Sequence, residues 1–136
     1  FNLTIREEYA TGLPLQRVVP QDFSRAVLNL MNNACYAVYN KSKRAAVGFE
    51  PVIAVSLRQE GDQICLQIED NGTGMPDAVK EQIFKPFYTT KPAGEGTGLG
   101  LSITRTIIEE KHKGTIQVDS EEGKFTRFTI RIPVTK

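Results

Sequence analysis

The chain has 136 residues, two cysteines and a formal net charge of +1, and 40% of its residues are hydrophobic. This length and composition suit one domain with one core, and the near-neutral charge argues against a nucleic-acid surface or a polybasic membrane contact. No apolar run approaches the length of a membrane-spanning helix and no signal peptide is recognised, so we expect a soluble domain. Cys35 and Cys65 lack metal-ligand spacing, and we expect both to be reduced and buried.

Hydrophobic periodicity predicts strands and helices along the whole chain. In chain order, these are a strand over 3–9, a short strand near 16–19, a helix from about 21 to 44, strands over 52–58 and 63–69, a short helix after Pro76, a helix over 101–109, and strands over 115–120 and 125–132. Runs of strands with about three helices predict an α/β fold, a two-layer sandwich whose mixed sheet is covered on one face. We expect residues 1–136 to form this single domain.

Two asparagines stand out in the first helix. Asn29 and Asn33 lie one turn apart and border the apolar stripe of the helix. Asparagine is a poor helix former, so its repeated use here needs a reason. One explanation is a solvated face. The other is a neutral carbonyl oxygen that could ligate a hard cation such as Mg²⁺, which prefers oxygen ligands.

A carboxylate and two glycines follow the strand over 63–69. Asp70 ends an alternating apolar run and begins the sequence DNGTG. A carboxylate accepts but does not donate hydrogen bonds, which suits the exocyclic amino group of adenine. Gly72 and Gly74 would let the backbone approach a flat base closely. The same five residues also fit an ordinary turn at the end of a strand.

A second glycine cluster, GEGTGLGLS over residues 94–102, runs directly into a helix. Free backbone amides at such a helix start could bind phosphate oxygens, although a flexible loop would use similar residues. Together, the two clusters indicate a nucleotide site.

Four segments in order give the chain a family resemblance. They are NLMNNA, DNGTG, IFKPFYTTK and GEGTGLGLS. They resemble the N, G1, F and G2 boxes of the ATP-binding catalytic domain of bacterial sensor histidine kinases, members of the GHKL superfamily with gyrase, heat-shock chaperone ATPases and mismatch-repair ATPases. The resemblance covers nearly the whole chain. It implies the Bergerat fold, ATP and Mg²⁺ as cofactors, and transfer of the γ-phosphate to a histidine.

By this resemblance, Asn33 is the Mg²⁺ ligand and Asn29 lines the same phosphate and metal region. Asp70 would read adenine, with Gly72 and Gly74 forming the adjacent wall. The other residues implied in nucleotide binding are Phe84, Phe87, Lys91, Gly96, Thr97, Gly98, Leu99 and Gly100.

The F-box phenylalanines Phe84 and Phe87 would anchor one end of a lid, although core packing explains Phe84 equally well. We expect the segment over 87–98, which has little apolar mass, to be disordered without nucleotide and to close over the phosphates with it.

One position distinguishes branches of the superfamily. Gyrase-like members carry a glutamate, the general base for the attacking water, where this chain has Asn29. An amide accepts no proton at neutral pH, so we expect slow hydrolysis and a kinase rather than a free-standing ATPase. Many histidine kinases also have a phosphate-contacting lysine where this chain has Tyr36. Candidates to replace it are Lys41, Lys43, Arg44 and Lys91.

The chain lacks an obvious phosphoacceptor. Its one histidine, His112, follows the last helix in a segment that resembles the family's HGG-like junction, with Lys113 as a surface variation where glycine is usual. We expect His112 to be structural and the acceptor to lie on a separate dimerisation domain of a larger protein.

That larger protein is expected to be a homodimer that serves a response-regulator receiver domain. It could be membrane-anchored, while this part would be cytoplasmic without direct membrane or nucleic-acid contact. An ATP-sensing or partner-binding module without kinase activity, or a GHKL ATPase, remains an alternative.

Overall fold

The computed structural model describes residues 3–13, 18–44, 48–86, 88 and 100–134. Its elements are β1 (Thr4–Tyr9), α1 (Pro20–Arg44), β2 (Val52–Glu60), β3 (Gln63–Asp70), α2 (Asp77–Lys80), α3 (Gly100–Thr106), the π-helix η1 (Ile107–Lys111), β4 (Thr115–Glu121) and β5 (Phe125–Pro133). The expected elements are confirmed with two exceptions, at the start of α1 and at the end of α3.

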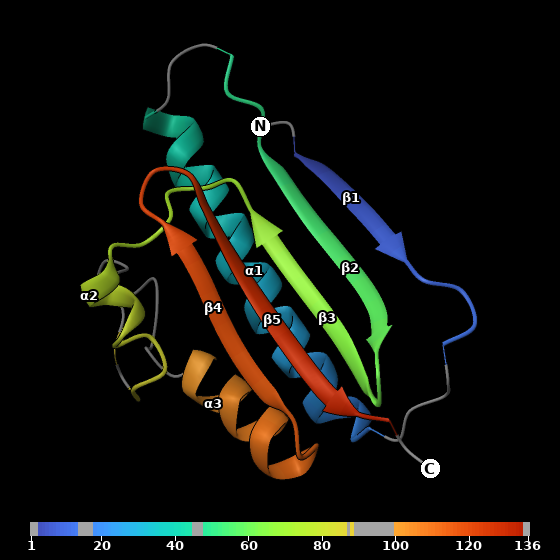
Figure 1. The fold of residues 1–136 in the computed structure, drawn as a ribbon. Helices are drawn as coiled ribbons and strands as arrows, with labels where there is room; N and C mark the ends of the chain where they lie inside the picture. Colours follow the sequence, from blue (N-terminus) through green and yellow to red (C-terminus); the bar gives the residue numbers. More distant parts are fainter. Residues whose placement is uncertain (1–2, 14–17, 45–47, 87, 89–99, 135–136) are drawn as a thin grey trace.

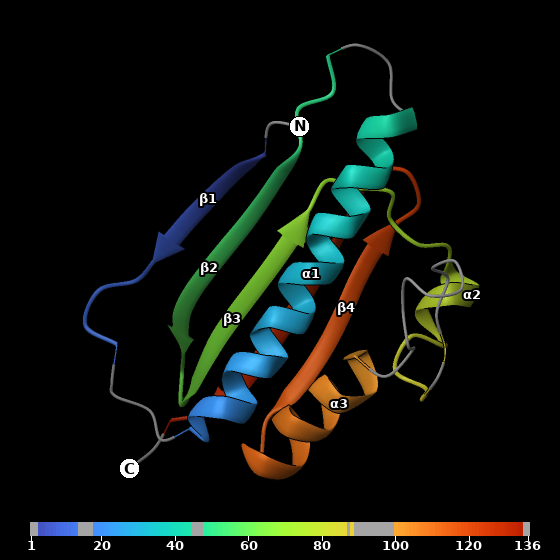
Figure 2. The same ribbon diagram turned by 180° about the vertical axis from the view of Figure 1, so that it is seen from behind.

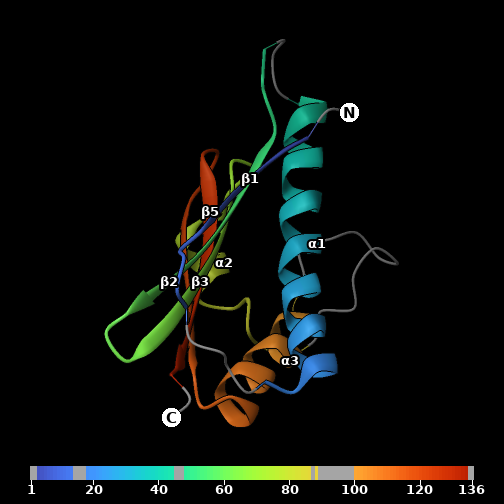
Figure 3. The same cartoon turned by 90° about the vertical axis from the view of Figure 1, so that its right-hand side faces the viewer.

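The five strands form one mixed sheet in the order β1-β2-β3-β5-β4 (Figure 1). β1 is parallel to β2, and the other neighbours are antiparallel. Helices α1 and α3 lie on the same face of the sheet, as the edge-on view shows (Figure 3). The predicted two-layer α/β sandwich is therefore confirmed.

The core lies between α1 and the middle of the sheet. The buried helix positions recur every four residues, which is the period of one face of an α-helix. They are Ala26, Leu30, Ala34 and Val38. On β5, the inward side chains are Phe128, Ile130 and Ile132, as their alternation predicts. From behind, α1 runs roughly along the direction of the strands, with α3 beside its first half (Figure 2).

The strand expected near 16–19 is wrong for its described part, because Val18 and Val19 have no strand structure. Instead, the Val19 carbonyl accepts a hydrogen bond from the Phe23 amide at 2.8 Å and so begins the first turn of α1. Residues 16 and 17 lie outside the described part of the chain.

The helix expected over 101–109 changes type after Thr106 and continues as η1. The wider π turn is followed by His112, whose ring nitrogen Nδ1 lies 3.0 Å from the carbonyl oxygen of Ile107. Both cysteines are free, with Cys65 buried and Cys35 half-buried. Among the described helices, none combines the length and the apolar character needed to cross a bilayer.

Candidate functional site

Asn29 connects the two helices that carry the predicted site. Its Nδ2 donates to the Gly100 carbonyl at 3.1 Å and to Thr104 Oγ1 at 3.2 Å. Thr104, which is fully buried, donates its hydroxyl to the same carbonyl at 2.8 Å. The structure therefore brings together Asn29 and Gly100, which are 71 residues apart in the sequence.

This arrangement gives a physical reason for an amide at position 29. The Gly100 carbonyl is an acceptor only, so it needs a donor, and a glutamate or aspartate carboxylate supplies none. The side-chain oxygen of Asn29 is not used in these two bonds. Thr104 was missed in the sequence, although its spacing of four residues from Gly100 on a helix could have suggested it.

Asn33 follows one turn later on α1 and is half-buried. Asn29 and Asn33 thus lie one turn apart on the same side of the helix. Tyr36 is also half-buried one turn further on.

Asp70 is the last residue of β3 and is only 4% exposed. Its Oδ1 accepts a hydrogen bond from the Gly72 amide at 2.8 Å, which leaves the second oxygen without a bond from that turn. Burial raises the pKa of Asp70 from 3.8 to about 7, opposed by the Gly72 hydrogen bond and by Lys41. A buried carboxyl that is poised near neutrality is unusual outside functional sites.

The two predicted glycines after Asp70 pack against protein rather than lying open. A Cβ on Gly72 would come within 2.6 Å of the Ala37 backbone, so only glycine lets this loop lie directly against α1. Gly74 has a positive φ of 64°, and its Cβ would overlap the Glu121 carbonyl at the end of β4. Both glycines therefore fix the loop that follows Asp70, in addition to any wall they form for a base.

Lys41 holds the same loop. Its Nζ donates to the Asn71 carbonyl at 3.0 Å and to the Gly123 carbonyl at 2.9 Å, and it lies over the Phe49 ring. The Gly123 amide in turn donates to the Thr73 carbonyl at 2.6 Å. Lys41, one of the candidates to replace the missing lysine, is therefore directed into this loop.

A further polar residue that the sequence did not reveal is Ser120 on β4. Its hydroxyl accepts from the Met75 amide at 2.9 Å, and its carbonyl accepts from Lys80 at 3.2 Å. These bonds attach the chain between Gly74 and α2 to the sheet. No sequence signal could have paired Ser120 with a segment 45 residues away.

Phe84 is half-buried and packs against the core. Its ring meets Phe128 edge-to-face with centroids 6.3 Å apart, and the Arg105 guanidinium lies 5.6 Å from the Phe84 ring centre. These contacts agree with core packing, the second explanation for Phe84, and its role beside a nucleotide stays a prediction. The predicted Phe87, Lys91, Gly96, Thr97, Gly98 and Leu99, and with them the lid over 87–98, lie outside the described residues.

His112 is structural, as expected. It is 7% exposed, and its two ring nitrogens bond the Val19 amide and the Ile107 carbonyl, each at 3.0 Å.

The interpretation of Lys113 as a mere surface variation needs correction. Its side chain is exposed, but its φ of 56° is left-handed, a conformation that costs an L-residue about 1–2 kcal/mol.

The predicted residues lie along α1 in two groups. Gly72, and with it Asp70, lies against Ala37, while Gly100 lies against Asn29. Eight residues of α-helix separate the two contacts, about 12 Å along the helix axis. A carboxylate at one end and amide groups at the other are thus held by a single rigid helix.

Comparisons with known proteins agree with this arrangement. The family described as histidine kinase-, DNA gyrase B-, and HSP90-like ATPase matches residues 18–136. The chain is 39% identical over 122 residues to the sensor histidine kinase ZraS of Escherichia coli O157:H7, covering 90% of this chain and 24% of ZraS. It is 51% identical over 74 residues to the sensor kinase CckA of Brucella abortus, covering 54% of this chain and 8% of CckA.

Among solved structures, the nucleotide-free catalytic domain of the histidine kinase ThkA matches with a TM-score of 0.78 and 29% identity, covering 96% of this chain and 78% of that one. The five-stranded sheet with its helices is thus the fold of histidine kinase catalytic domains. The chain belongs to the histidine kinase-, DNA gyrase B-, and HSP90-like ATPase family. It spans about a quarter of the length of ZraS.

Proposed function

We propose that this domain binds ATP with Mg²⁺ and donates the γ-phosphate to a histidine on a separate dimerisation domain. The observation that carries the proposal is Asp70, a buried carboxyl with one oxygen bonded by its own turn and the other left for a donor. An adenine amino group is a donor that this second oxygen could accept. The buried setting would strengthen that bond, because little water competes for it.

The phosphate end of the proposed site lies at Asn29 and Asn33. Asn33 would ligate Mg²⁺ through its amide oxygen, and the metal would be shared with the phosphates. When bound, Mg²⁺ would neutralise charge that develops on the transferred phosphoryl group. Gly100 and the preceding residues 96–99, together with Lys91, would complete this end of the site.

The domain supplies no general base at position 29, because the Asn29 amide donates to α3. Slow hydrolysis is therefore expected, and catalysis would consist of positioning and electrostatic stabilisation. The attacking group must come from outside, since the only histidine of the chain is buried with both ring nitrogens bonded. This supports a separate domain that carries the acceptor histidine. We further propose, from the family, a homodimeric, multidomain parent that serves a response-regulator receiver domain.

Calorimetric titration with a non-hydrolysable ATP analogue and Mg²⁺ tests the nucleotide site. Wild type should bind, Asp70→Ala should lose the affinity for ATP, and GTP should bind weakly to wild type. Asn33→Ala should lose only the part of the ATP affinity that depends on Mg²⁺. A folded wild type that binds no nucleotide, or binds ATP and GTP equally, would contradict the proposal. Phosphoryl transfer to an added acceptor domain then separates a kinase from a sensing module.

A further inference from the structure

His112 joins the end of η1 to the start of α1. Its Nε2 accepts from the Val19 amide, and its Nδ1 faces the Ile107 carbonyl, each at 3.0 Å. Its ring also meets Phe23 edge-to-face at 5.4 Å. An amide can only donate and a carbonyl can only accept, so the ring is neutral and carries its proton on Nδ1.

The contact lies on the same two helical segments as the Asn29 contact. Phe23 and Asn29 are six residues apart on α1, and Ile107 directly follows α3, which begins at Gly100. Among the described residues, hydrogen bonds therefore join α1 to the α3–η1 segment near both ends of their seam. At one end, the Val19 amide donates to His112 and Lys111 donates to Asp22; at the other, Asn29 donates to Gly100.

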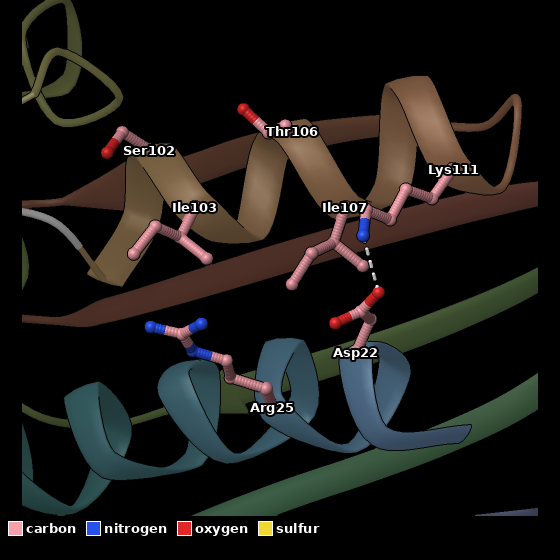
Figure 4. A pocket seen from close by; sticks show the side chains of 7 residues that line it. All are labelled: Asp22, Arg25, Ser102, Ile103, Thr106, Ile107 and Lys111. Carbon is pink, nitrogen blue, oxygen red and sulfur yellow. Dashed lines mark hydrogen bonds and ion pairs between the residues drawn. The ribbon is translucent and has the colours of Figure 1, made fainter. Parts of the chain in front are cut away.

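Between these two ends the inner side of the seam is packed, with Leu30 and Ile107 buried in the same core cluster, and its outer side is grooved. A groove of about 210 Å³ opens there, with Ile103 and Ile107 on one side and Arg25 on the other (Figure 4). Close packing normally fixes the distance between neighbouring helices. On the grooved side packing contributes less, so the contacts at the two ends add to the constraint that the core imposes.

We propose that His112 is a positioning residue for the phosphate end of the nucleotide site. By holding the start of α1 against η1, it keeps Asn29 on Gly100 and sets the distance between the two helices that would bind the phosphates and Mg²⁺. This inference rests on the proposed nucleotide site. It assigns no such role to the adenine end, because Asp70 lies on β3 and its loop packs against the far half of α1.

A second contact at the same end serves as the control. Lys111 pairs with Asp22 at 2.7 Å, seen as the dashed line in Figure 4. Their side chains are 49% and 28% exposed, and such surface pairs contribute little. Lys111→Ala removes a link between the same two helices without touching the His112 ring.

The test compares the affinities of ATP–Mg²⁺ and of adenosine in the same calorimetric series. His112→Ala should weaken the affinity for ATP–Mg²⁺ by about tenfold or more, which is about 1.4 kcal/mol. The affinity for adenosine should stay nearly unchanged. Lys111→Ala should change neither affinity. A role in stability alone would lower both affinities together, through the folded fraction.

Two conservative variants separate the two hydrogen bonds. A glutamine side chain reaches far enough to accept from the Val19 amide, whereas asparagine reaches only the Ile107 carbonyl. His112→Gln should therefore restore much of the ATP–Mg²⁺ affinity and His112→Asn should not. Equal behaviour of these two variants would overturn the inference, and their comparison decides the matter if His112→Ala does not fold.

A nucleotide-free measurement keeps this inference separate from the proposed function. In wild-type protein, nitrogen NMR should show His112 protonated on Nδ1 only, and the Asn29 side-chain amide should shift in His112→Asn but not in Lys111→Ala. An unmoved Asn29 amide overturns the positioning role whatever the nucleotide data show. A wild type that binds neither ligand refutes the proposed function instead.

Discussion

Asp70→Asn should stabilise the nucleotide-free domain while abolishing its adenine contact. The asparagine keeps a carbonyl oxygen for the Gly72 amide, so the hydrogen bond of the turn is retained. It removes only the charge, and the 4% exposure of Asp70 makes that charge costly. The change is therefore a nearly isosteric test of what ionising Asp70 costs the fold.

The magnitude follows from the pKa of Asp70, which burial raises from 3.8 to about 7. A carboxyl whose folded-state pKa is raised binds its proton more tightly in the folded state. Its stabilisation is present below pH 3.8 and is lost as the pH rises through about 7. The full loss is about 4 kcal/mol, of which about 2.5 kcal/mol falls between pH 5 and pH 8.

Urea unfolding of wild type and Asp70→Asn at pH 5 and pH 8 measures this directly. The contributions of all other titrating groups to the free energy of unfolding cancel in the difference between the two proteins. The stability advantage of the variant should grow by about 2.5 kcal/mol between these pH values. An advantage that is the same at both would refute the reasoning, because it would mean that Asp70 ionises without cost. Saturating ATP–Mg²⁺ should stabilise wild type at pH 8 and not the variant.

Three further substitutions test the remaining contacts by the free energy of unfolding. Asn29→Asp should cost about 2 kcal/mol, because a carboxylate cannot donate to the α3 carbonyl; the exposed Asn32→Asp is its control, and equal effects would contradict the account. Gly74→Ala should cost about 3 kcal/mol from overlap and positive φ, against about 1 kcal/mol for Gly61→Ala, where φ is also positive but the space is open. Lys113→Gly should add about 1 kcal/mol by removing left-handed strain; a similar gain from Lys113→Ala would point to the side chain instead.

The sequence predicted the elements well where a periodic apolar pattern met a clear boundary. The alternation on β5 and the four-residue spacing on α1 identified the core, since both patterns report a local conformation. The strand near Val19 was wrong because two valines looked extended, whereas their conformation is decided by the helix start and by His112, 93 residues away.

Within the candidate site, the chemistry of Asn29 was predictable and its partner was not. The absence of a base could be read from one residue type, but the bond to Gly100 depends on how two helices pack. The same holds for Lys41, whose charge suggested a phosphate and whose contacts are two loop carbonyls. Long-range hydrogen bonds leave no periodic signal, so side-chain partners were the part that sequence reasoning could not reach.

The turn between β4 and β5 limits how this domain can be engineered. Hairpin tips are ordinarily the places where a domain accepts an inserted tag or reporter module. Here the Gly123 backbone is bonded to Thr73 and Lys41, and Glu121 touches Gly74, so an insertion over residues 121–124 would displace the loop beside Asp70. The β2–β3 turn at Gly61, at the opposite end of β3, has open space around it and is the better place for a fused reporter.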